Sequence, residues 1–210
     1  MTRRAWFAII LAAPALAGIV DRIAVTVANR VITASDVETR LRLSAFQNGE
    51  QPDFALAARR AAVQLLIDQR LIEREMKVGH YPQLGAEERT RLVPTFAASG
   101  YNSSVTVLEQ ALAGARLTRQ DLEDDLARQF ELITFLNLRF RPAVQVSDEE
   151  VERYYRERGT EQAPLAEARP AIEQRIATER ADRELENWLA EQRRRTRIVF
   201  VEADLRGVAK

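Results

Sequence analysis

The chain has 210 residues and carries 31 basic residues (Lys and Arg) against 31 acidic ones, with one histidine and no cysteine. This length allows one large domain or two small ones with a buried core. The balanced charge argues against a nucleic-acid-binding protein, which needs a basic excess to neutralise phosphates. The absence of cysteine excludes disulfides, a thiol nucleophile and zinc–thiolate sites, and a single histidine excludes any scheme that needs a histidine pair.

The first residues are typical of a secretory signal peptide. Arg3 and Arg4 are followed by an uncharged run over 5–20, and residues 15–17 read Ala-Leu-Ala, the small-x-small pattern of a signal-peptidase site. We therefore expect a signal peptide over 1–17, cleavage before Gly18 and a periplasmic location. An uncleaved membrane anchor is the alternative, although the run is shorter than the roughly 18–20 residues that span a bilayer.

The residues that follow predict a β-hairpin and then a chain of helices. Apolar residues alternate from Ile23 to Val27, Asn29 tolerates the positive φ of a tight turn, and 31–33 read Val-Ile-Thr. Sequences of the capping-box type, in which an N-terminal hydroxyl and an acid three residues later satisfy each other's backbone amides, predict helix starts near residues 36, 119 and 148. These sequences are Ser35–Glu38, Thr118–Asp121 and Ser147–Glu150.

Apolar residues at the helical period predict two long helices. One apolar face runs from Ala58 to Met76 and includes Leu65. The other runs from Leu122 to Phe140, and we assign Phe130 and the neighbouring members of this face to the core. A shorter helical pair is expected at 86–99 and 104–114.

The end of the chain predicts how the whole domain closes. A last long helix is expected from Leu165 to Arg195, followed by a strand from Ile198 to Val201. Because a lone terminal strand needs a partner, we expect the two ends of the chain to meet in one sheet. The predicted fold is therefore mainly α, a single domain over 18–210 with a small β-sheet that joins the N-terminal hairpin to the C-terminal strand.

The sequence offers few groups for catalysis. It contains no GxxxxGK[ST] phosphate loop, no GxSxG nucleophile turn and no HExxH metal helix. His80 lies in a Gly-His-Tyr-Pro turn and is interpreted as a surface or capping residue. Three consecutive acids, Glu123–Asp125, point in different directions on a helix and are interpreted as a solvated face. We predict no catalytic residue, no metal site and no cofactor.

The order of these elements resembles the SurA-type periplasmic chaperones. Residues 19–37 are similar to the start of that family, where a hairpin after the signal peptide runs into a capped helix. The sequence Leu-Leu-Ile-Asp-Gln-Arg-Leu-Ile at 65–72 resembles its next signature. Residues 147–155 resemble the segment that leads into the family's parvulin isomerase domain, and 164–189 resemble the helix that follows that domain.

The resemblance implies a SurA-like chaperone module without the parvulin domain. Only nine residues separate Tyr155 from Leu165, and the histidine-rich parvulin constellation is absent. The module would consist of an N-terminal part over 18–159 and a C-terminal helix and strand over 164–202. By resemblance, it would be an ATP-independent holdase for unfolded exported proteins, outer-membrane proteins in particular, with no nucleic acid or nucleotide as partner. A structural or assembly subunit that binds one folded partner, and a residual peptidyl-prolyl isomerase, are the alternatives.

Four aromatic residues are candidates for contact with clients, because they lie at predicted helix ends or in loops: Phe46, Phe54, Phe96 and Tyr101. The alternative is that each belongs to the core, as most large aromatic residues do, and for Phe96 we favour that alternative.

Overall fold

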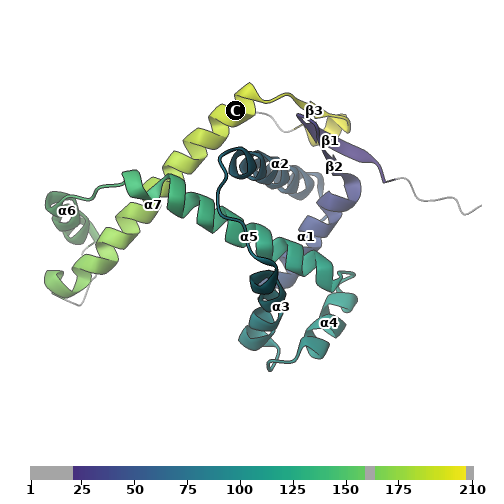
Figure 1. Cartoon of the computed structure of the whole chain (residues 1–210), viewed down its shortest axis with the longest axis horizontal. Coiled ribbons are helices and arrows are strands. Elements are labelled where there is room, and N and C mark those ends of the chain that lie inside the picture. Colours follow the sequence, from purple (N-terminus) through teal and green to yellow (C-terminus); the bar gives the residue numbers. More distant parts are fainter. Residues whose placement is uncertain (1–20, 159–163, 207–210) are drawn as a thin grey trace, which may run out of the picture.

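The computed structural model describes residues 21–158 and 164–206 (Figure 1). Along them the elements are β1 (Ile23–Val27), β2 (Arg30–Thr33), α1 (Ala34–Asn48), α2 (Leu56–Val78), α3 (Ala86–Gly100), α4 (Val105–Gly114), α5 (Arg119–Arg139), the short 3-10 helix η1 (Arg141–Ala143), α6 (Asp148–Arg158), α7 (Leu165–Arg195), β3 (Ile198–Phe200) and the 3-10 helix η2 (Ala203–Leu205). This is the mainly helical fold with a small sheet that the sequence predicts. The expected signal peptide, residues 1–17, lies outside the described residues.

The three strands form one antiparallel sheet in the order β2–β1–β3. In the β1–β3 pair, Val25 lies opposite Phe200 and Val27 lies opposite Ile198. Because β3 follows the last helix, this pairing joins the two ends of the described chain and encloses all of its helices between them. The prediction that the two ends meet in one sheet is confirmed.

The turn of the hairpin differs from the prediction. Ala28 has the positive φ, at 53°, and Asn29 does not. The amide of Ala28 donates a hydrogen bond of 2.8 Å to the carbonyl oxygen of Arg197, just before β3. This bond between the chain ends holds alanine in a conformation that a side chain with Cβ ordinarily avoids. Local turn preferences could not reveal it.

The helix starts agree with the predicted capping boxes in two cases out of three. Thr118–Asp121 opens α5 and Ser147–Glu150 opens α6, each with the reciprocal hydrogen bonds of the motif. The predicted box at Ser35–Glu38 is wrong. Thr33 is the N-cap of α1 and exchanges bonds of 3.1 and 2.9 Å with Asp36, since the helix begins directly after β2.

Buried apolar side chains form three clusters. The central core combines the sheet with α2, the C-terminal half of α5 and the C-terminal half of α7. A second cluster fills a lobe made by α3 and α4 with parts of α1 and α5, the α3–α4 lobe. A third joins α6 to the N-terminal half of α7, the α6–α7 lobe. Figure 1 shows the two lobes at the two ends of α5.

Phe135 fixes α5 in the central core. Its side chain is fully buried, and its ring centroid lies 5.3 Å from that of Tyr81, 5.6 Å from that of Phe140 and 5.1 Å from that of Trp188 on α7. The tilted and edge-on arrangement of these rings is favourable for their quadrupoles. The guanidinium of Arg139 lies 5.5 Å from the ring centroid of Trp188 and covers the outer side of this cluster.

A buried charge connects α5 to α1. Asp125 has no exposed surface, and its carboxylate accepts hydrogen bonds from Arg40 (2.7 Å), Gln47 (3.0 Å) and Gln129 (2.8 Å). The interpretation of 123–125 as a solvated face is therefore wrong for Asp125, because α1 crosses α5 at this position. A sequence pattern cannot reveal that crossing.

Removal of β3 tests the closure of the chain. A protein that ends at Arg195 lacks the β1–β3 ladder and the buried Leu205. We expect a lower melting temperature, because one fully buried leucine alone contributes about 1.5–3 kcal/mol. Thermal unfolding followed by circular dichroism measures the effect, with a chain that ends at Arg206 as the control. An unchanged melting temperature after truncation at Arg195 would contradict the closure.

Substitution of Asp125 tests the link between α1 and α5. Asp125→Ala leaves the guanidinium of Arg40 without its partner in a half-buried position, and we expect a loss of about 3–5 kcal/mol in the free energy of unfolding. Asp124→Ala, at a partly exposed neighbour, is the matched control and should cost well under half as much. Urea denaturation gives both values. Equal losses would show that the buried Asp125 pair stabilises the protein no more than the partly exposed Asp124 pair.

Candidate functional site

Three of the four candidate aromatic residues come together in the α3–α4 lobe. The rings of Phe46 and Tyr101 are stacked with centroids 6.0 Å apart and planes 8° apart, and Phe96 lies 6.1 Å from Tyr101. All three are partly buried against the cluster of this lobe. They therefore close the edge of a small core, and the part of each ring that reaches the surface is limited.

Phe54 lies apart from this group. It precedes α2 and is 43% exposed, and the guanidinium of Arg42 lies over its ring at 5.1 Å from the centroid. Of the four candidates it has the most accessible ring. The structure thus places one candidate as an isolated exposed aromatic residue and three in a partly buried aromatic stack.

The outer face of α5 is an apolar surface that sequence reasoning assigned to the core. Phe130 is 41% exposed and Ile133 is 59% exposed. An α-helix turns about 100° per residue, so both lie roughly opposite the buried Phe135. The assignment of Phe130 to the core is therefore wrong. The available signal was the second half of α5, which has apolar residues all round the helix and cannot bury every one of them.

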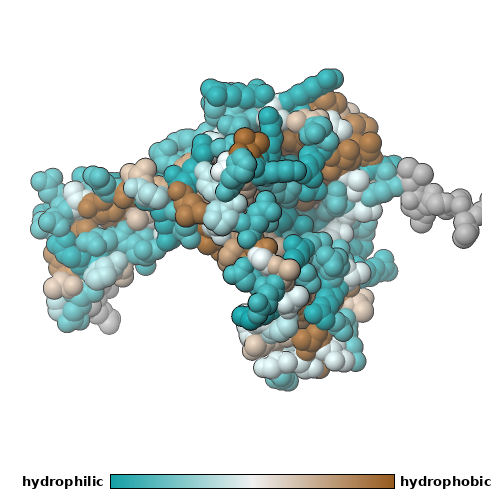
Figure 2. All heavy atoms as spheres, in the orientation of Figure 1, coloured by the Kyte–Doolittle hydropathy of each residue, from teal (hydrophilic) through white to brown (hydrophobic). Residues whose placement is uncertain are grey.

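A groove between α2, α5 and α7 lies on another side of α5. Its apolar lining consists of Leu65, Ile72, Leu132, Leu185 and Leu189, and its volume is about 220 Å³. Leu65 is 50% exposed, which corrects its assignment to the buried face of α2. Around α5, Leu132 lies about 100° from Ile133 and about 160° from Phe130, so the groove and the outer face lie on different sides of this helix. Figure 2 shows hydrophobic surface along α5, beside hydrophilic side chains.

Ion pairs hold most of the charged side chains around the groove. Arg193 donates two hydrogen bonds of 2.7 Å to Asp68, one to each carboxylate oxygen. Arg70 pairs with Glu73 at 3.1 Å, and Arg128 shares the buried Asp125 at 3.6 Å. These pairs place the charged ends of the side chains at the border of the groove.

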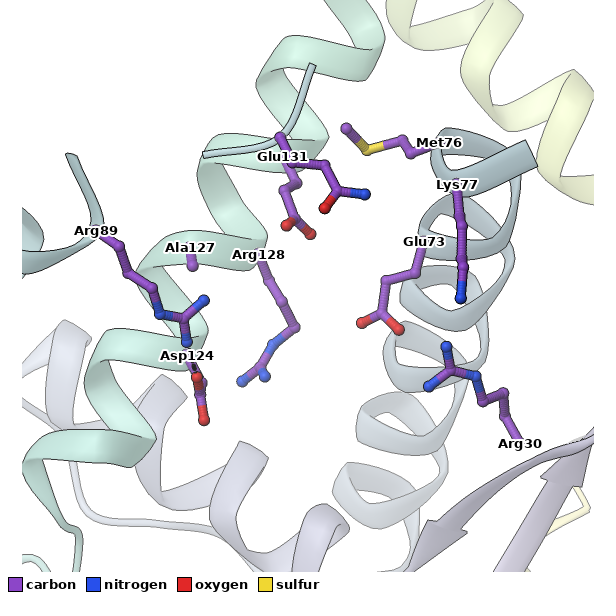
Figure 3. Close-up of a pocket in the computed structure, with 10 residues that line it drawn as sticks. Arg30, Glu73, Met76, Lys77, Arg89, Asp124, Ala127, Arg128 and Glu131 are labelled. Atoms are coloured by element: carbon purple, nitrogen blue, oxygen red, sulfur yellow. Dashed lines mark hydrogen bonds and ion pairs between the residues drawn. The ribbon is translucent and has the colours of Figure 1, made fainter. Parts of the chain in front are cut away.

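A polar pocket continues from one end of the groove (Figure 3). Glu73 extends into it from α2 and Glu131 from α5, and both residues also line the groove. Burial, and to a lesser degree the charge of Glu73, raises the pKa of Glu131 above its ordinary value, against a smaller opposing effect of Arg89 and Arg128. Within residues 21–158 and 164–206, no group of three or more His, Asp or Glu side chains is arranged to hold a metal ion.

His80 lies outside these surfaces. It follows Gly79 at the end of α2, is exposed and has a φ of 53°. The interpretation of His80 as a surface residue at a helix end agrees with this position. In the described part of the chain, no helix has both the length and the apolar character that a membrane span requires.

Comparison with known proteins adds no family to this description. No family model matches the chain, and a search among curated proteins also gives no match. Any inference about function therefore rests on the side chains described above, which form exposed apolar surfaces beside paired charges.

The aromatic stack and the isolated Phe54 should respond differently to substitution. Tyr101→Ala removes two ring contacts and part of the packing of the α3–α4 lobe, and we expect it to lower the free energy of unfolding by about 1–3 kcal/mol. Phe54→Ala removes an exposed cation–π contact and should cost less than about 1 kcal/mol. Chemical denaturation of both variants measures the two losses in free energy of unfolding. A larger loss for Phe54→Ala than for Tyr101→Ala would contradict this assignment.

Proposed function

We propose that this protein is an ATP-independent holdase that binds apolar and aromatic segments of unfolded polypeptides. The proposal rests on two accessible apolar surfaces, the outer face of α5 and the groove between α2, α5 and α7. Phe130, Ile133 and Leu65 are each between two fifths and three fifths exposed although their helices pack well on other sides. Exposed large apolar side chains commonly mark surfaces that bind another chain.

The border of this surface fits a reversible binder of many sequences. Burial of apolar area requires no fixed sequence, and the ion pairs at the border keep the free protein hydrated. Such binding is an equilibrium that needs no nucleotide, which accords with the absence of a phosphate-loop motif. Each contact contributes little, so a client must offer several apolar side chains at once.

The clients and the location are part of the same proposal. The SurA-like order of sequence motifs favours exported clients, with unfolded outer-membrane proteins first among them, and the N-terminal sequence favours the periplasm. An assembly subunit with one folded partner would use the same apolar surface. Binding assays with a set of unfolded proteins and a set of folded proteins distinguish the holdase from the assembly subunit. For residual prolyl isomerase activity, the described residues add nothing that favours it.

The proposal predicts suppression of aggregation by the apolar surface. Purified protein is titrated into a diluted, unfolded outer-membrane β-barrel protein without ATP, and aggregation is followed by light scattering. The double substitution Phe130→Gln and Ile133→Gln should raise the concentration needed for half-suppression about fivefold, which corresponds to roughly 1 kcal/mol of lost apolar contact. Glutamine is chosen because it is a good helix former.

The control is Val78→Gln, which removes an exposed apolar residue near the end of α2, away from the outer face of α5. It should leave suppression unchanged. No suppression of any unfolded client, together with tight binding to one folded protein, would favour the assembly subunit. If the protein accelerates cis/trans exchange of an X-Pro peptide and His80→Ala abolishes that acceleration, the isomerase becomes the favoured function.

A further inference from the structure

Glu131 occupies a distinctive place in the apolar groove. The groove and the polar pocket share Glu73, Arg128 and Glu131, so the two form one continuous depression between α2 and α5. Figure 3 shows the side chains of Glu131 and Glu73 pointing into this depression from opposite helices. A client segment that lies along the groove would therefore bring its next side chains to these carboxylates.

The charged side chains that line the groove take part in ion pairs, with one exception. Asp68 and Glu186 both lie by Arg193, at 2.7 and 3.9 Å. The other lining charges are paired as described above: Glu73 with Arg70, and both Arg40 and Arg128 with Asp125. Among the described residues, no basic side chain lies within ion-pair distance of Glu131. The groove therefore presents one unpaired carboxylate next to an apolar floor.

The basic residues around the depression do not neutralise Glu131. Arg89 of α3 is held by Glu123 at 2.9 Å and also pairs with Asp124. Arg30 of β2 and Lys77 of α2 line the polar pocket but not the groove. Their charges lie beyond ion-pair distance of Glu131, whose ionised form is disfavoured by burial and by Glu73. A cation delivered from outside would offset this cost.

We propose that the groove selects client segments in which a lysine or arginine stands beside apolar residues, and that Glu131 receives the cation. This inference rests on the proposed holdase function and specifies its substrate class. The aliphatic stem of a lysine or arginine would pack along Leu132 and Ile72, while its charged end reaches the carboxylate. Apolar contact supplies general affinity, and Glu131 supplies the preference among segments.

The test compares peptides that differ in one charge. Labelled extended peptides contain the same aromatic and aliphatic residues and carry Lys, Gln or Glu at one central position, and fluorescence anisotropy gives the dissociation constants. We expect the Lys peptide to bind the unmodified protein about fivefold more tightly than the Gln peptide, the scale of one partly exposed ion pair. Glu131→Gln should abolish this preference, so that the Lys and Gln peptides bind the variant with equal affinity.

Two controls identify the residue and the charge. Glu186→Gln removes an acid at the border of the same groove and should keep the preference for the Lys peptide. Lower pH should remove the preference in the unmodified protein, because Glu131 becomes protonated as the pH falls through its raised pKa. The affinity for the Gln peptide should not fall as Glu131 is protonated.

The outcomes separate this inference from the function on which it rests. Equal affinity for the Lys and Gln peptides, with suppression of aggregation intact, would overturn the role of Glu131 alone. Tighter binding of the Glu peptide would also overturn it and would point to Arg30 and Lys77 as the selecting charges. Absence of binding to all three peptides, together with no suppression of aggregation, would overturn the holdase itself.

Discussion

Helix α5 takes part in two separate cores, and this division determines which of its side chains are available to bind. Its N-terminal half contributes Leu122 to the α3–α4 lobe, while its C-terminal half contributes Phe135 to the central core. A helix can turn only one side towards each neighbour. Since α1, α3, α2 and α7 occupy the other sides, Phe130 and Ile133 have no covering element. The exposed apolar surface is thus a geometric result of one helix serving two cores.

The sequence predicts well what depends on local chemistry. The bounds of α7, the caps at Thr118 and Ser147 and the strand at Ile198 all follow from residue type and period. Prediction from the sequence fails where a residue far along the chain determines the backbone conformation or the burial of a side chain. Arg197 fixes the conformation of Ala28 and Arg40 draws Asp125 into the interior, both across long sequence separations. The assignment of Phe130 to the core is wrong for the same reason, because its exposure depends on which helices lie opposite it.

The choice of arginine over lysine has a structural consequence for the apolar surface. Of the 31 basic residues only Lys77 and Lys210 are lysines. Arginine has a planar fork of donors, so Arg193 can hold both oxygens of Asp68 and Arg89 can bridge two neighbouring acids. A lysine ammonium would make looser contacts and leave its long stem free to move over nearby leucines. Forked pairs therefore keep the border of the groove in place while its floor stays accessible.

The α6–α7 lobe has a different relation to the rest of the molecule. Among residues 21–158 and 164–206, its cluster draws only on Val146, α6 and the first half of α7, and a pairing of Arg180 with Glu150 ties the two helices to each other. The lobe is therefore a self-contained attachment point at the far end of α7 from the sheet (Figure 1). The central core, the sheet and the groove take no described residue from α6, so a change confined to α6 leaves their own contacts in place.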